Sequence, residues 1–133
     1  MSSSADVPSA STCPSVIDCH AALNSFICLA RCLALASAGA GIEAVVHFAG
    51  LKSVGESVAN PALYFDNNVG GAAALLQAMD RHGIGRIVFS SSATVYGVPE
   101  RLPYAESHRL QPANPYGQSK LEVERLLARH AAA

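Results

Sequence analysis

Two short runs rich in β-branched and aromatic residues narrow the choice of fold more than any other part of this sequence. They are residues 44–48 (AVVHF) and 86–89 (RIVF), and both are typical of strands buried on both faces of a parallel sheet. Between them, apolar residues recur at helical spacing from Pro61 to Met79, and Gly83 ends the pattern. A proline-rich loop (90–115) and an amphipathic helix (116–130) follow. This order predicts an α/β fold built on a parallel crossover unit.

Residues 1–41 form a leader that differs in composition from the rest of the chain. It holds only three charged residues but all four cysteines, Cys13, Cys19, Cys28 and Cys32. Arg31 interrupts the apolar stretch 21–40, which argues against a signal peptide and a membrane helix. The cysteines lack the C-x-x-C pairs usual in zinc sites. We therefore expect a disordered start and an apolar helix, without a family match, ahead of a domain over residues 42–133.

A glycine motif at residues 39–44 (GAGIEA) matches the loose dinucleotide-binding pattern G-x-G-x-x-A. That pattern binds a pyrophosphate only where it follows a strand and opens a helix, and here the strand comes after it. We interpret it as a helix end and a turn.

Polar residues capable of chemistry follow each predicted strand, where open α/β sheets bind their ligands. Residues 49–52 (AGLK) follow the first strand and 90–97 (SSSATVYG) the second. The last helix then opens with Tyr116 and Lys120, which share one helical face. A lone Y-x-x-x-K is a weak signal, but a serine cluster at the end of the preceding strand strengthens it.

These segments together resemble a known family. Residues 47–57 (HFAGLKSVGES), 66–69 (DNNV), 89–97 (FSSSATVYG) and 115–120 (PYGQSK) resemble the middle of the UDP-glucose 4-epimerases. Those enzymes belong to the extended short-chain dehydrogenase/reductase family of NAD-dependent epimerases and dehydratases. The resemblance runs from Gly41 to Leu127 and implies a partial Rossmann-like, doubly wound parallel sheet, with two legible strands and crossover helices.

The resemblance assigns catalytic roles to three residues. Tyr116 is similar to the tyrosine that takes the proton from the sugar 4-hydroxyl. Lys120 is similar to the lysine that stabilises this tyrosine's charged form and hydrogen-bonds the nicotinamide ribose, and a nearby ammonium has that effect on a phenolate. Ser92 is similar to the serine that hydrogen-bonds the same sugar oxygen.

The resemblance also implies a set of residues that bind NAD. These are Phe48, Ala49, Gly50, Lys52, Asn67, Ser90, Ser91, Tyr116 and Lys120. Taken singly, Phe48 could belong to the core and Asn67 could be a polar residue early in a helix. No metal ligand set is expected.

The implied activity is NAD-dependent interconversion of UDP-glucose and UDP-galactose through a 4-keto intermediate. Related dehydratases carry acidic residues just after the strand-end serine or threonine, and here those positions are Ala93 and Thr94, which favours epimerisation. The choice between UDP-hexose and UDP-N-acetylhexosamine is left open. The alternative interpretation is an inactive remnant or an interaction fragment of such an epimerase.

The leader supplies neither the glycine-rich loop nor the acidic residue that the family places upstream. We therefore expect a truncated gene product whose isolated chain folds poorly and binds NAD weakly. A net charge of −1 gives no footprint for nucleic acid or an anionic membrane. A UDP-sugar is the expected partner, the resemblance allows a homodimer, and the absence of a disulfide framework points to the cytoplasm.

Overall fold

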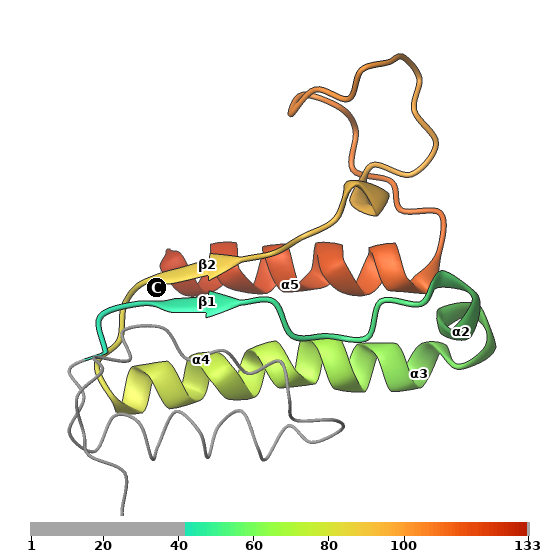
Figure 1. The fold of residues 1–133 in the computed structure, drawn as a ribbon. Helices are drawn as coiled ribbons and strands as arrows, with labels where there is room; N and C mark the ends of the chain where they lie inside the picture. The colour runs from blue at the N-terminus through green and yellow to red at the C-terminus, as the bar shows by residue number, and fades with distance from the viewer. Residues whose placement is uncertain (1–41, 133) are drawn as a thin grey trace, which may run out of the picture.

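The computed structural model describes residues 42–132 (Figure 1). The expectations for the leader concern residues outside this range. We expected a disordered start, an apolar helix and a turn beginning at residue 39, and we expected no signal peptide, membrane helix or cysteine zinc site there. Within the described part, no helix combines the length and the apolar character needed to cross a bilayer.

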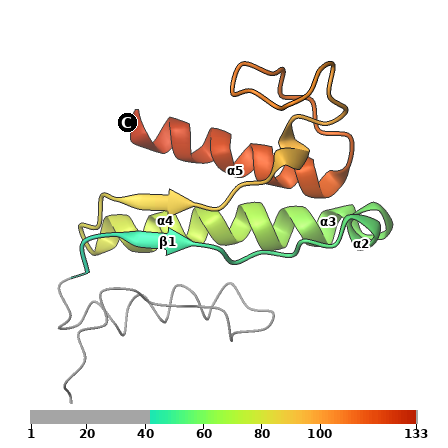
Figure 2. The same cartoon turned by 45° about the horizontal axis from the view of Figure 1, so that its top comes forward.

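The predicted strands form a two-stranded parallel sheet. Strand β1 (Val45–His47) pairs with β2 (Ile87–Phe89), with Val45 opposite Ile87 and His47 opposite Phe89. Both strands lie inside the predicted runs and are shorter than expected. In Figures 1 and 2 the helices α4 (Gly71–Arg81) and α5 (Pro115–Ala131) run back against the strand direction, as a crossover connection requires.

The segment between the strands is more divided than the sequence suggested. It contains α2 (Val54–Ala59), α3 (Pro61–Tyr64), the π-helix η1 (Phe65–Gly70) and α4. The predicted start at Pro61 is confirmed, but the single helix expected from there contains a π-helical turn. Helix α2 was not predicted, because its six residues are too few to show a periodic apolar pattern.

The chain after β2 contains the long loop and the last helix. A short 3₁₀ turn, η2 (Ala93–Val95), interrupts the predicted loop. The loop then projects away from the body of the molecule (Figure 1), where the rings of Tyr96 and Tyr104 stack with their centroids 5.4 Å apart. Helix α5 begins at Pro115, one residue before its predicted start.

The core lies on one face of the sheet. Leu75, Leu76, Ala78, Met79 and Ile84 are buried there, and the partly buried Ile42, Val45, Ile87, Leu126 and Leu127 pack against them. The prediction that the strands are buried on both faces is wrong for β2, because the Val88 side chain is 61% exposed. On the face opposite this core, Val88 is exposed while Val46 of β1 is partly buried.

Candidate active site

Lys120 is buried at the junction between α5 and the end of β2. Only 5% of its surface is exposed, and its Nζ donates a hydrogen bond to the Ser90 carbonyl oxygen at 3.0 Å. The same Nζ lies 4.7 Å from the centroid of the Phe89 ring. Burial lowers the pKa of Lys120 below its usual value, because the charged form loses solvation.

Tyr116 lies on the first turn of α5, whose start is well specified by the sequence. Asn114 caps the helix, its side-chain oxygen accepting a hydrogen bond from the Gly117 amide at 2.8 Å, and Pro115 takes the first helical position. The half-buried Tyr116 ring meets the buried Tyr64 ring edge to face, with centroids 6.4 Å apart. Tyr116 and Lys120 both lie on α5 and are about one helical turn apart, as predicted.

Ser92 caps the short turn η2 directly after β2. Its Oγ accepts hydrogen bonds from the Thr94 amide at 3.3 Å and from Thr94 Oγ1 at 2.9 Å. Helix α5 approaches this turn closely at Gly117, where a Cβ would lie 2.7 Å from the Thr94 carbonyl oxygen. A glycine at this position lets the first turn of α5, with Tyr116, pack directly against η2.

Asn68 joins three parts of the site, and the sequence interpretation missed it. Its Oδ1 accepts from the Leu51 amide at 2.8 Å, and its Nδ2 donates to the Leu51 carbonyl and to Ser119 Oγ, both at 3.0 Å. Ser119 Oγ in turn donates to the Tyr116 carbonyl at 2.8 Å. Asn68 thus connects η1, the loop after β1 and α5, and it is 4% exposed.

The loop after β1 passes beside Lys120 at Gly50. This glycine has φ +150°, and a Cβ there would lie 2.9 Å from Asn68 Oδ1 and 3.8 Å from Lys120 Nζ. The predicted neighbours Phe48, Ala49 and Lys52 are exposed along the same loop. Phe48 is 69% exposed, which excludes the alternative that it belongs to the core.

The remaining predicted residues lie around these groups. Ser90 holds Lys120 through its carbonyl, and Ser91 Oγ hydrogen-bonds Glu124 Oε1 on α5. Asn67 is half-buried in η1, next to Asn68. No cluster of metal-binding side chains occurs in the described part of the chain.

His47 is the last residue of β1, at this end of the sheet, and is 6% exposed. Its ring packs against Phe89, with the centroids 5.4 Å apart. Burial lowers the pKa of His47 to about 4, and the positive charge of Lys120 acts in the same direction. His47 is therefore neutral near pH 7.

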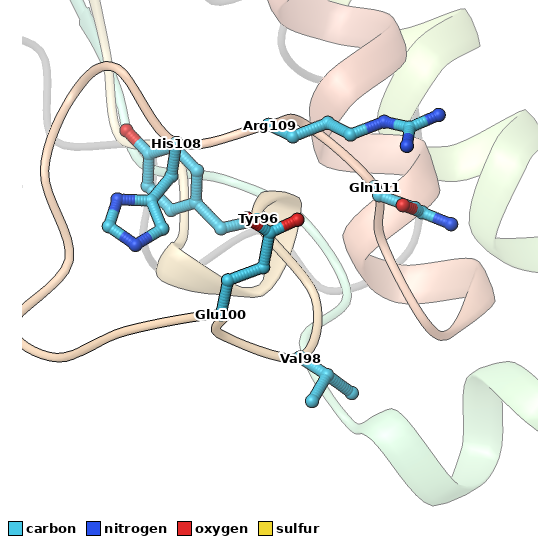
Figure 3. A pocket seen from close by; sticks show the side chains of 6 residues that line it. All are labelled: Tyr96, Val98, Glu100, His108, Arg109 and Gln111. Carbon is cyan, nitrogen blue, oxygen red and sulfur yellow. The ribbon is translucent and has the colours of Figure 1, made fainter.

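A shallow hollow elsewhere does not coincide with these residues. It is formed by the projecting loop and lined by Tyr96, Val98, Glu100, His108, Arg109 and Gln111 (Figure 3). None of these is a predicted site residue, and their side chains come from the loop rather than from the strand ends.

A comparison with protein families shows to which family the chain belongs. The profile of the NAD dependent epimerase/dehydratase family matches residues 22–133, most of the sequence. The chain belongs to this family. The match begins inside the leader that we had set apart from the family region.

Curated members of the family provide similar sequences. The chain is 59% identical over 86 residues to the UDP-glucose 4-epimerase of Bacillus subtilis, covering 65% of this chain and 25% of that protein. It is 60% identical over 87 residues to the UDP-glucose 4-epimerase of Neisseria gonorrhoeae, covering 65% and 26%. The chain thus spans about a quarter of the length of these curated relatives.

Solved structures of the family share the fold. The UDP-glucose 4-epimerase of Brucella ovis in complex with NAD superposes with a TM-score of 0.76 at 43% identity, over 83% of this chain and 34% of that one. The enzyme from Stenotrophomonas maltophila, with NAD and formylated UDP-arabinopyranose, gives 0.74 at 49% identity, over 82% and 32%. The predicted partial Rossmann-like α/β fold is confirmed.

The donor set of this family member suits the nicotinamide ribose part of NAD. The buried Lys120 ammonium has three donors and uses one on Ser90. Gly50 lies beside that ammonium, and because it has no side chain, it leaves space there. A ribose hydroxyl is a suitable acceptor for the remaining donors, so the residues present fit this part of the cofactor.

Proposed function

We propose that this chain carries the catalytic middle of an NAD-dependent UDP-glucose 4-epimerase. The observation that supports it most strongly is the position of Lys120. Its ammonium is buried against Ser90 at the end of β2, beside Gly50 and one helical turn from Tyr116. These are the positions that the family resemblance assigns to catalysis and to the nicotinamide ribose.

In this proposal Tyr116 handles the proton and Lys120 supports it. Tyr116 Oη takes the proton from the sugar 4-hydroxyl and later returns it. Lys120, one helical turn further along α5, supports this transfer through its positive charge, as the family resemblance implies. NAD, when bound, would supply reversible hydride transfer at carbon 4 of the sugar, with Lys120 among the residues that hold it.

Ser92 orients the substrate. Its Oγ accepts two hydrogen bonds from Thr94, which leaves its own hydroxyl proton to donate to the sugar oxygen. Thr94 and the exposed Ala93 stand where dehydratases of the family carry acidic groups, and neither is a general acid. This supports epimerisation over loss of water.

The proposal includes binding partners and location. A UDP-hexose is the proposed substrate, a homodimer the proposed assembly and the cytoplasm the proposed location. Phe48, Ala49, Lys52, Asn67 and Ser91 are proposed to contact NAD together with Gly50, Ser90, Tyr116 and Lys120.

The test combines cofactor binding with turnover. The purified chain is titrated with NAD by calorimetry and assayed for conversion of UDP-galactose. A chimera is assayed beside it, in which this chain replaces the segment of the Bacillus subtilis enzyme to which it is 59% identical. Conversion by the chimera supports the proposal. A folded chimera that binds NAD without converting UDP-galactose contradicts it and favours the inactive remnant.

A further inference from the structure

The environment of Lys120 contains an aromatic ring where a buried lysine usually has a carboxylate. Its Nζ lies 4.7 Å from the Phe89 centroid, within the range of a cation–π contact. Its hydrogen-bond partner is the uncharged Ser90 carbonyl. Among residues 42–132, no carboxylate forms an ion pair with it.

The Phe89 ring is held in place from the neighbouring strand. His47 is its direct partner across the parallel pair, and the two rings are tilted by 34° with centroids 5.4 Å apart. Since His47 is neutral near pH 7, the ring does not have to accommodate a second cation from β1. The negative face of the ring is thus available to the Lys120 ammonium.

We propose that Phe89 is a positioning residue for Lys120. The face of its ring stabilises the buried ammonium and, with the Ser90 carbonyl, fixes the place of Nζ at the end of β2. The catalytic meaning of this contact rests on the proposed function, but the contact itself is independent of NAD and substrate.

The composition of the chain makes the contact directly measurable. The chain has two lysines, the buried Lys120 and the exposed Lys52. Labelling lysine with carbon-13 at Cε therefore gives two signals, of which Lys52 is an internal reference. The pH dependence of each signal reports the charge state of its own ammonium, without cofactor or turnover.

We expect Phe89→Leu to lower the pKa of Lys120 by about one unit, a tenfold change in its acid dissociation constant, with no change at Lys52. Phe89→Trp keeps an aromatic face and should retain most of the wild-type value. Val88→Leu, on the opposite face of the same strand, is the matched control and should leave both lysines unchanged. If Phe89 had a purely structural role, Phe89→Leu would lower the stability of the chain without a selective change in the pKa of Lys120.

A second measurement guards against a variant that fails to fold. In the wild-type chain, the Lys120 Cε protons should be shifted upfield by the ring current of Phe89 relative to those of Lys52. An unshifted Lys120 signal, or a folded Phe89→Leu chain with an unchanged Lys120 pKa, overturns the proposal. Failure of NAD binding or of epimerase turnover would instead contradict the proposed function and leave these two readouts intact.

Discussion

Asn67 and Asn68 are neighbouring residues of the same type in different environments. The family resemblance assigns Asn67 to NAD binding, which stays a prediction, and the structure shows that its neighbour Asn68 is buried and makes three hydrogen bonds. The π-helical turn η1 contains both residues, and such turns are common at functional sites. Periodicity assumes 3.6 residues per turn, so it could not tell which asparagine points inward.

Replacing Asn68 should lower the stability of the folded chain. Asn68→Ala leaves the Leu51 amide and carbonyl without their partner, so we expect a loss of about 1–3 kcal/mol in the free energy of unfolding. Asn67→Ala is the matched control and should cost less. Urea denaturation measures both, and equal losses would contradict this assignment.

His47 should make stability fall in acid. Its pKa is about 4 in the folded chain and about 6.5 when unfolded, so the unfolded state binds the proton more readily. Its contribution is fully present above pH 6.5 and is lost as the pH falls from 6.5 to 4. Because each pKa unit corresponds to about 1.4 kcal/mol, the loss is at most a few kcal/mol.

The measurement is the difference between two stability curves, wild type and His47→Leu, over pH 3.5–8. The variant should lack this part of the pH dependence. Parallel curves for the two proteins across that range would refute the contribution of His47.

Among the elements, α5 was predicted well and α2 was missed for physical reasons. Helix α5 has a capping asparagine, a proline at its first position and an apolar stripe of several turns, all legible in the sequence. Helix α2 exposes Val54 and Val58 and has no such stripe. It is held by hydrogen bonds to the next helix, α3, such as Tyr64 Oη to Glu56 Oε2 at 2.7 Å, and a periodic apolar pattern does not reveal such polar contacts.

The cap of α5 should matter for the element that carries Tyr116 and Lys120. Asn114→Ala removes the acceptor of the Gly117 amide and should reduce the free energy of unfolding by about 1 kcal/mol. Asn114→Asp retains a side-chain acceptor and should recover most of the loss. A cost as large for Asp as for Ala, by chemical denaturation, would argue against the capping role.

At the scale of the whole molecule, the sequence predicted the class of fold and the end of the sheet where the candidate residues gather, but it did not predict the burial of the sheet. The polar residues after β1, those after β2 and the start of α5 lie at one end of the sheet, because parallel strands present their carboxyl ends at the same edge. The predicted two-sided burial failed at Val88, since apolar composition records what a strand is suited to and not which elements cover it. The roles of Ser92, Tyr116 and Lys120 remain predictions until tested.

The chimera with the Bacillus subtilis enzyme offers the most direct test of those roles. We expect it to interconvert UDP-galactose and UDP-glucose, and Tyr116→Phe to lower kcat by at least about 100-fold because proton transfer is lost, while calorimetry shows NAD binding nearly unchanged. Lys120→Met should weaken both NAD binding and turnover. Tyr104→Phe, in the projecting loop, is the matched tyrosine control and should leave kcat unchanged. Near-normal turnover of the Tyr116→Phe chimera would contradict the catalytic assignment.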